Sequence, residues 1–137
     1  MIRKFHEAKA GGTDVVRLWG DGSPLREFLF AGDLADAVVY LMESRTAADL
    51  RNPAGDFVNV GTGSELTIKE LAEAVYTDVR NDGRRCRMEW DTSLPNGTPR
   101  KLCDVSRLAA LGWRAKVGVK EGIRIAYEDF LHGNVRK

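Results

Sequence analysis

The sequence predicts an α/β fold built as a single domain over residues 1–137. Segments with strand periodicity alternate with segments of helical periodicity, and no long series of strands occurs. A chain of 137 residues is long enough to bury a hydrophobic core. Its 43% hydrophobic and 30% charged residues are ordinary for a soluble globular domain. Because no repeat, low-complexity segment or linker interrupts the chain, we expect one domain.

Charge and cysteine content exclude several classes of function. The 21 basic and 20 acidic residues give a net charge of +1, so no overall field attracts nucleic acid or an anionic membrane. No apolar run approaches transmembrane length. The two cysteines, Cys86 and Cys103, and the two histidines, His6 and His132, lack the spacing of metal ligands. We therefore expect a cytoplasmic protein with free thiols and no metal, nucleic-acid or membrane binding.

The first half of the chain is expected to hold two helices and two extended segments, at residues 2–10 (helix), 15–19 (strand), 26–30 (extended) and 33–44 (helix). Gly11-Gly12 ends the first helix. Since no N-cap precedes this helix, we interpret it as the tail of a longer one. Asp33 is the expected N-cap of the second helix.

A tight turn separates the first strand from the next extended segment. Gly20, Gly22 and Pro24 mark this turn, because glycine tolerates positive φ and proline fixes its own. Trp19 precedes the turn and Arg26 follows it. An aromatic ring near a guanidinium fork suits a planar base and a phosphate. A structural tryptophan with a surface arginine is the other interpretation of this pattern.

The second half is expected to contain, in order, a loop at 45–56, a strand at 57–60, a helix after Thr67, an edge strand at 84–90, an ordered loop at 91–104, a short helix capped by Asp104 and a last helix at 119–132. Thr67 and Glu70 form a capping box. The preceding Gly61-Thr62-Gly63 lacks the third glycine of a dinucleotide fingerprint, and Glu65 would repel a phosphate. We predict a turn there, and no cofactor loop.

The loop at 91–104 presents two adjacent cations. Pro95 and Pro99, with Asn96-Gly97 between them, favour a fixed loop. This loop leads into Arg100 and Lys101, so we expect it to position them, although a solvated basic pair is the usual alternative. No Ser-His-Asp set, nucleophile elbow or Tyr-x-x-x-Lys pair is present. The residues therefore predict a binding domain that is not a catalyst by itself.

Three motifs give the chain a close resemblance to the GDP-L-fucose synthase family of the extended short-chain dehydrogenase/reductase superfamily. They are Trp-Gly-x-Gly-x-Pro-x-Arg-Glu-Phe-Leu from Trp19, Val-Asn-Val-Gly-Thr-Gly from Val58, and Gly-Thr-Pro-Arg-Lys-Leu-x-Asp from Gly97. The resemblance covers essentially the whole chain. It implies the small substrate-binding C-terminal domain of such an enzyme, lacking the N-terminal Rossmann domain.

The resemblance also implies an activity for the full-length enzyme. Such an enzyme epimerises C3 and C5 of GDP-4-keto-6-deoxymannose and then reduces C4 with NADPH. Its N-terminal half holds the NADP(H) and the catalytic residues. The resemblance therefore implies that this chain alone binds no cofactor and is inactive, that its missing partner is the Rossmann half, and that the full-length protein is a homodimer. Strands that would pack on that half should leave an exposed apolar patch.

Site residues are implied position by position. The family's substrate-binding positions fall on Lys4, Trp19, Arg26 and Lys101, where the cations face the pyrophosphate of the GDP-sugar and the Trp lines the nucleotide pocket. Asn96 stands where family members commonly have Asp, a position linked to substrate contact. Two alternatives stay open: the substrate domain of another NAD(P)-dependent nucleotide-sugar epimerase or dehydratase, and a stand-alone, non-catalytic nucleotide-sugar-binding module.

Overall fold

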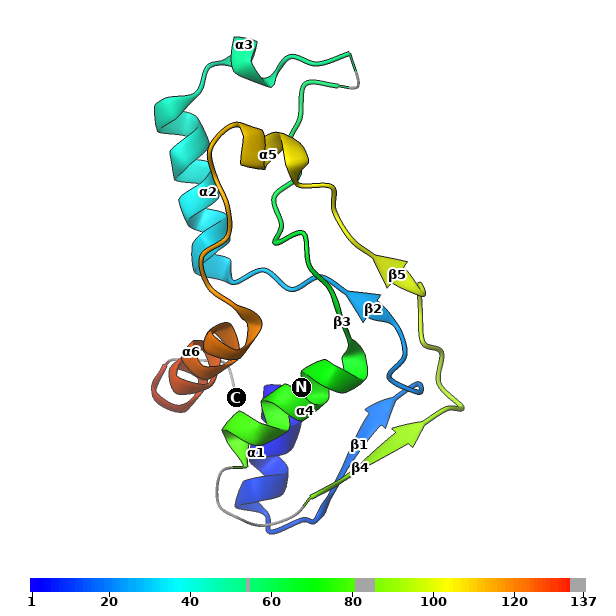
Figure 1. Cartoon of the computed structure of the whole chain (residues 1–137). Helices are drawn as coiled ribbons and strands as arrows, with labels where there is room; N and C mark the ends of the chain where they lie inside the picture. The colour runs from blue at the N-terminus through cyan, green and yellow to red at the C-terminus, as the bar shows by residue number, and fades with distance from the viewer. Residues whose placement is uncertain (54, 81–85, 134–137) are drawn as a thin grey trace. The chain divides into compact units, whose positions relative to one another are not determined.

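The computed structural model describes residues 1–53, 55–80 and 86–133. From the N-terminus to the C-terminus its elements are α1 (Ile2–Ala10), β1 (Val15–Trp19), β2 (Leu25–Arg26), α2 (Ala31–Ser44), α3 (Ala47–Leu50), β3 (Leu66–Thr67), α4 (Ile68–Val79), β4 (Arg87–Asp91), β5 (Arg100–Lys101), α5 (Ser106–Ala110) and α6 (Val119–His132), as Figure 1 shows.

The chain divides into two compact units. Unit 1 comprises Met1–Arg26, Leu66–Arg100 and Lys120–Lys137, and unit 2 comprises Glu27–Glu65 and Lys101–Val119. Each unit is therefore built from segments that are distant in the sequence. We describe them separately.

Unit 1 is built on a pair of parallel strands, β1 and β4. Their register places Val15 opposite Arg87 and Trp19 opposite Asp91. Side chains of β1 alternate, as the period of a strand requires. Val16 and Leu18 are buried, whereas Arg17 and Trp19 are exposed. The end of β1 therefore presents Trp19 on the open face of the strand pair.

Helices α1 and α4 supply apolar faces to unit 1. Phe5 and Ala8 of α1 are buried, and the Phe5 ring lies 6.2 Å from the ring of Tyr76 in α4. The predicted capping box of α4 is confirmed. The Glu70 amide donates to Thr67 Oγ1 over 3.1 Å, and the Thr67 amide donates to the Glu70 carboxylate over 2.7 Å. The start of α4 thus follows from a signal within its own first turn.

Two further features complete unit 1. The short strand β2 pairs with β3 in antiparallel fashion, and the Leu25 amide donates to the Pro99 carbonyl over 2.9 Å. The last predicted helix is confirmed as α6, where Ile123 is buried. On the same helix the Tyr127 hydroxyl lies 3.1 Å from Nδ1 of His6. These contacts connect α6 to the N-terminal helix.

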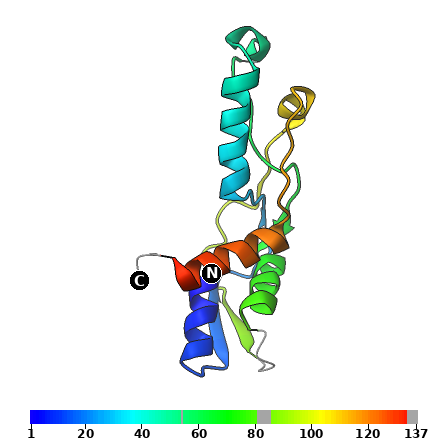
Figure 2. The same cartoon turned by 90° about the vertical axis from the view of Figure 1, so that its left-hand side faces the viewer.

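Unit 2 packs α2 against α5 and the segment after it. Ala37, Leu108 and Trp113 form a buried apolar cluster. In Figures 1 and 2 α5 lies beside α2, in agreement with this cluster. Asp33 is buried, and its carboxylate accepts the amides of Lys116 and Val117 over 2.9 and 2.8 Å. Polar and apolar contacts therefore both fix α2 within this unit.

Several predicted boundaries are wrong in unit 2. Asp33 is not the N-cap of α2, because the helix begins two residues earlier, after Phe30, and the Asp33 carboxylate is occupied by residues 116–117. The loop expected at 45–56 contains α3, which has its own capping box between Thr46 and Asp49. The strand expected at 57–60 is absent, since these residues form no ladder with another described segment.

The remaining corrections are smaller. The extended segment at 26–30 is a strand only at Leu25–Arg26, and the loop at 91–104 contains the two-residue strand β5. The strand expected at 84–90 is found as β4, and residues 84 and 85 lie outside the described residues. Asp104 is not the N-cap of α5, because Val105 holds that position, although the Asp104 carboxylate accepts the Ser106 amide at the start of the helix over 2.9 Å.

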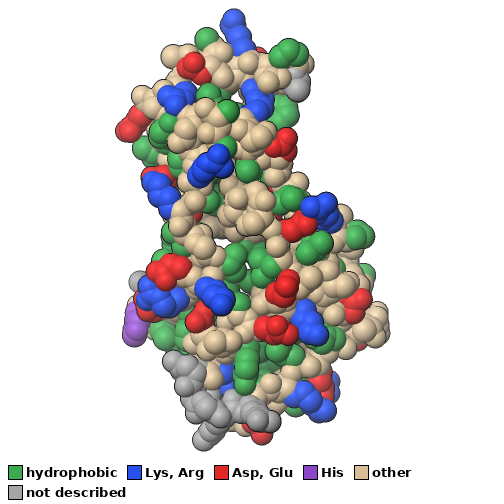
Figure 3. Space-filling model, in the orientation of Figure 1, with side chains coloured by type: hydrophobic (Ala, Val, Ile, Leu, Met, Phe, Trp, Pro, Cys, Tyr) green, Lys and Arg blue, Asp and Glu red, His purple; other side chains and the backbone are tan. Residues whose placement is uncertain are grey.

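Charges of both signs are mixed over the surface in view. On the face drawn in Figure 3, Lys and Arg side chains alternate with Asp and Glu side chains, as expected from a net charge of +1. Among the described residues, every helix is too short or too polar to span a bilayer.

Candidate functional site

The turn that follows β1 is held by the loop around Asn96. The Gly20 amide donates to the Asp91 carbonyl over 2.9 Å, which continues the pairing of β1 with β4. Gly20 has a φ of +73°, and a Cβ added there would lie 2.1 Å from Oδ1 of Asn96. Only glycine fits, because it tolerates positive φ and leaves room for the amide. The turn and the Asn96 loop are therefore in direct contact.

Asn96 bonds the main chain of this turn. Its Oδ1 accepts the Asp21 amide over 2.9 Å. An aspartate at this position could accept the same hydrogen bond, so the difference from the family pattern leaves this contact intact. Hydrogen bonds from Ser23, and a smaller contribution from Asn96, lower the pKa of Asp21. In the structure Asn96 thus supports the turn, and its contact with substrate stays a prediction.

Arg26 lies where the turn ends. Its Nη1 donates to the Leu25 carbonyl over 2.6 Å, and its Nη2 donates to the Thr98 carbonyl. The same Nη2 lies 3.8 Å from the place where a Cβ at Gly97 would be. These contacts fix the guanidinium against the loop at 96–98. A guanidinium carries further N–H groups, so donors remain for an anion.

Lys4 and Trp19 are neighbours, although 15 positions of sequence separate them. The Lys4 ammonium lies 6.0 Å from the centroid of the Trp19 ring and donates to the Arg17 carbonyl over 2.9 Å. The Trp19 side chain is 68% exposed. A cation beside an exposed ring provides a flat apolar surface with positive charge at its edge.

The structure brings four of the five predicted site residues into one unit. Lys4, Trp19, Arg26 and Asn96 lie on α1, the turn at 19–26 and the loop at 96–98, all in unit 1. Lys101 is exposed and lies at the start of the last segment of unit 2. Its convergence with the other four therefore stays a prediction. The group offers cations and an aromatic face, which suit binding of a phosphorylated base.

The glycine loop at 61–63 is occupied by a carboxylate. The amides of Thr62 and Gly63 donate to Oε1 of Glu27 over 2.6 and 2.7 Å, and the Cys103 amide donates to Oε2 over 3.0 Å. A Cβ at Gly61 would lie 2.5 Å from the same carboxylate. This loop cannot hold a phosphate as built, because its N–H groups are already bonded to a negative charge. The predicted turn fits these contacts.

Glu27 is the residue that sequence reasoning missed. Partial burial raises its pKa, but the hydrogen bonds from Cys103, Gly63 and Thr62 outweigh this effect, so the net shift is downward. The carboxylate is therefore ionised at neutral pH. A carboxylate beside Arg26 in an extended segment was the available signal, yet its partners lie 35 or more positions away.

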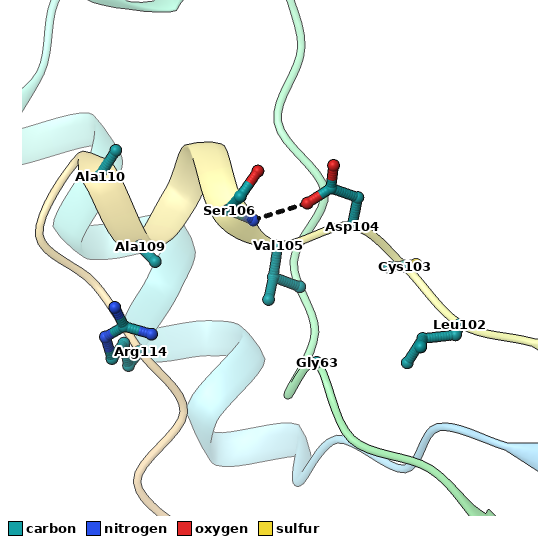
Figure 4. Close-up of a pocket in the computed structure, with 9 residues that line it drawn as sticks. All are labelled: Gly63, Leu102, Cys103, Asp104, Val105, Ser106, Ala109, Ala110 and Arg114. Carbon is teal, nitrogen blue, oxygen red and sulfur yellow. Dashed lines mark hydrogen bonds between the residues drawn. The ribbon is translucent and has the colours of Figure 1, made fainter.

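Unit 2 also has an open hollow of about 640 Å³ beside α5. Figure 4 shows Asp104 and Ser106 joined by a hydrogen bond at the start of α5, with Val105 and Arg114 on the side of the hollow. Cys103 also lines it. Burial and then the Glu27 charge raise the pKa of the Cys103 thiol, so it is a poor nucleophile at neutral pH. None of the predicted site residues lines this hollow.

Comparison with known proteins first defines a class. Residues 1–61 match the NAD dependent epimerase/dehydratase family. The solved structure of MlghC, a GDP-mannoheptose C4 reductase from Campylobacter jejuni with NADP bound, has a TM-score of 0.82 and 33% identity to this chain, and the match covers 95% of this chain and 43% of that one. The α/β fold of an extended short-chain dehydrogenase/reductase, present in part, is confirmed.

The sequence comparison points to a narrower group of proteins within this class. The chain is 50% identical to a putative GDP-L-fucose synthase 2 of Arabidopsis thaliana over 137 residues, which are 100% of this chain and 39% of that protein. It is 41% identical to the GDP-L-fucose synthase of Escherichia coli (strain K12), over 99% of this chain and 42% of that protein. The predicted resemblance to GDP-L-fucose synthases is confirmed. The chain spans about two fifths of the length of these relatives.

Proposed function

We propose that this chain is the GDP-sugar-binding part of a GDP-L-fucose synthase. The full-length enzyme would convert GDP-4-keto-6-deoxymannose to GDP-L-fucose. The observation that carries the proposal is the 50% identity over the whole chain to a relative with that name. The grouping of Lys4, Trp19 and Arg26 in unit 1 supports it, because these side chains suit a nucleoside diphosphate.

Each side chain has a role in this proposal. Arg26 donates its remaining N–H groups to the pyrophosphate, and its bonds to Leu25 and Thr98 hold the fork in place. Lys4 adds a second positive charge, and the exposed ring of Trp19 lines the nucleotide pocket. Lys101 supplies a third cation. Asn96 contributes by fixing the turn between Trp19 and Arg26.

The cofactor belongs to another part of the enzyme in this proposal. NADPH, when bound, supplies the hydride that reduces C4 of the sugar. The glycine loop at 61–63 does not fit its phosphates, because Glu27 occupies the amides of Thr62 and Gly63. We assign NADP(H) binding and acid–base chemistry to an N-terminal Rossmann half, and we expect this chain alone to be inactive. The homodimeric state and the cytoplasmic location are predictions of the same proposal.

Titration calorimetry with nucleoside diphosphates tests the proposal. GDP, UDP and dTDP are titrated in turn into the purified chain. We expect measurable heat of binding with GDP alone. Binding of UDP or dTDP with equal affinity would point to another nucleotide-sugar epimerase or dehydratase. A second assay follows NADPH oxidation in the presence of the keto-sugar, where turnover by the chain alone would contradict the assignment of catalysis to the other half.

A further inference from the structure

The open face of the strand pair in unit 1 carries side chains of both charges next to Trp19. Strands β1 and β4 run side by side in parallel (Figure 1), and their register places Arg17 opposite Glu89 and Trp19 opposite Asp91. Arg17 and Trp19 are exposed, whereas Leu18 between them is buried. Neighbouring strands lie about 4.8 Å apart, so Asp91 stands directly beside Trp19.

A hollow of about 220 Å³ lies among these side chains, and its walls are Arg17, Glu89, Trp90 and Asp91. The exposed ring of Trp19 is next to it, because Asp91 is both a wall of the hollow and the register partner of Trp19. Proteins that hold a base outside a duplex stack it on aromatic rings and bond its edge with neighbouring polar side chains. The hollow is therefore placed to receive the edge of a base that stacks on Trp19.

Arg17 and Asp91 both keep hydrogen-bonding groups for a ligand. Nε of Arg17 donates to Oε2 of Glu89 over 3.3 Å, and neither Nη atom donates to a described residue. Oδ1 of Asp91 accepts the amide and the hydroxyl of Ser93 over 3.1 and 2.5 Å, and Oδ2 accepts no hydrogen bond from the described part of the chain. Hydrogen bonds from Ser93, with a smaller effect of the Arg17 charge, lower the pKa of Asp91. The hollow thus has an ionised acceptor, held in place by Ser93, beside a cationic donor.

Guanine is the base whose edge matches this pair. It carries two adjacent acceptors, O6 and N7, to which an arginine commonly donates two hydrogen bonds. The same edge continues with two adjacent donors, N1–H and the 2-amino group, which a carboxylate can accept. Uracil and thymine offer a single N–H donor between two carbonyl oxygens, so a carboxylate would face repulsion there. Guanine therefore satisfies the donor and the acceptor of the hollow together.

We propose that Arg17 and Asp91 recognise the guanine of a GDP-sugar whose base stacks on Trp19. Arg17 donates to O6 and N7, and Asp91 accepts N1–H and the 2-amino group. Glu89 positions Arg17 through the ion pair at Nε. The proposal rests on the proposed function, and it adds to that function the residues that select the base.

Asp91→Asn tests the contact with the base. Asparagine keeps an oxygen for Ser93 and replaces the free acceptor with an N–H donor, so the local fold should persist. Inosine diphosphate lacks the 2-amino group of GDP, and xanthosine diphosphate has a carbonyl oxygen in its place. Titration calorimetry gives the dissociation constants of the three nucleotides for the wild type and the variant.

The expected result is a change of base preference. The wild type should bind GDP about tenfold more tightly than inosine diphosphate, and Asp91→Asn should remove this preference. The variant should bind xanthosine diphosphate about tenfold more tightly than the wild type does, because its amide donates to the new carbonyl. Structural damage alone would not create affinity for xanthosine diphosphate. The same base preference in the variant and the wild type would overturn the proposal.

Asp104→Asn is the matched control. Asp104 is also an exposed aspartate whose Oδ1 accepts the amide of the serine two positions later, over 2.9 Å, but it lies in unit 2. All three dissociation constants should stay within about twofold of the wild-type values in this variant. If Asp104→Asn alters the base preference as much as Asp91→Asn does, the proposal is wrong.

Arg17→Ala tests the other half of the contact. GDP and inosine diphosphate both carry O6 and N7, so their dissociation constants should rise together, by about tenfold. A GDP dissociation constant that stays at the wild-type value would overturn the role of Arg17.

These titrations also separate this proposal from the proposed function. A chain that prefers GDP to UDP and dTDP, and keeps its preference for GDP over inosine diphosphate in Asp91→Asn, would overturn the reading of guanine by Asp91 and leave the proposed function. A chain that binds no nucleoside diphosphate would overturn both.

Discussion

The turn at 19–26 in unit 1 and the glycine loop at 61–63 in unit 2 look alike as candidate phosphate sites, but their polar groups are used differently. In the turn, Asn96 holds the main chain at Asp21, and Arg26 has N–H groups beyond those that it donates to the Leu25 and Thr98 carbonyls. In the glycine loop, Glu27 takes the amides of Thr62 and Gly63. A glycine pattern therefore indicates an anion site only where its donors are still open.

Removal of the Arg26 guanidinium should have the largest effect, which is a loss of affinity for GDP at the turn. A charge-assisted contact contributes roughly 1.5–3 kcal/mol when shielded from water, and about 1.4 kcal/mol corresponds to tenfold in affinity. We expect Arg26→Ala to raise the dissociation constant for GDP roughly 10- to 100-fold in calorimetry. Arg124→Ala is the control, because Arg124 pairs with Glu121 and Glu128 on α6. Equal losses in both variants would place the nucleotide elsewhere.

The geometry of the turn itself is tested by Gly20→Ala. A Cβ at this position meets Oδ1 of Asn96 at 2.1 Å and requires a φ of +73° from alanine. We expect a loss of about 1–3 kcal/mol in the free energy of unfolding, measured by urea denaturation. Gly118→Ala is the matched control, since no atom lies within 4 Å of its added Cβ. If the two variants have the same stability, the contact with Asn96 does not hold the turn.

Elements that depend on local contacts could be predicted from the sequence, whereas elements that depend on distant partners could not. The bounds of β1 and α6 and the capping box of α4 follow from periodicity and from side chains within one or two turns. The strand expected at 57–60 failed because a strand needs a partner, and none is present among the described segments. Asp33 failed as a cap because its partners lie 83 and 84 positions away.

The site was predictable only in part for the same reason. The resemblance selected Trp19, Arg26 and Asn96, and the structure joins them through the turn. The role of Glu27 requires contacts with two remote loops, at 62–63 and 103, which no local pattern encodes. Asn96 likewise could not be assigned to the turn before its oxygen was placed beside Gly20.

Glu27→Gln tests whether the Glu27 carboxylate holds the glycine loop at 61–63. The pKa of Glu27 is lowered in the folded state, so its contribution to stability is present above the unfolded pKa of about 4.3 and is lost as the pH falls through the lower folded value. Because the group is partly exposed, we expect a loss of only about 1 kcal/mol at pH 7. The variant should also depend less on pH below about 4.3.

Urea denaturation between neutral and acidic pH measures both effects of Glu27→Gln. Glu73→Gln serves as the control, since Glu73 is exposed on α4 and lies in the other unit. A Glu27 variant with the stability and pH profile of the Glu73 variant would show that the carboxylate does not hold the glycine loop.

The smallest expected effects are those of alanine substitutions at two lysines on the same helix, which should differ in whether they change GDP binding or stability. Lys4 and Lys9 of α1 each donate to a backbone carbonyl over 2.9 Å, to Arg17 and Val79 respectively. The first contact is exposed and lies beside Trp19, whereas the second is half-buried. Lys4→Ala should therefore weaken GDP binding several-fold and change the free energy of unfolding by less than about 1 kcal/mol. Lys9→Ala should lower stability by about 1 kcal/mol and leave GDP binding unchanged. If calorimetry and denaturation rank the two lysines the other way round, Lys4 and the exposed ring of Trp19 do not form part of the nucleotide site.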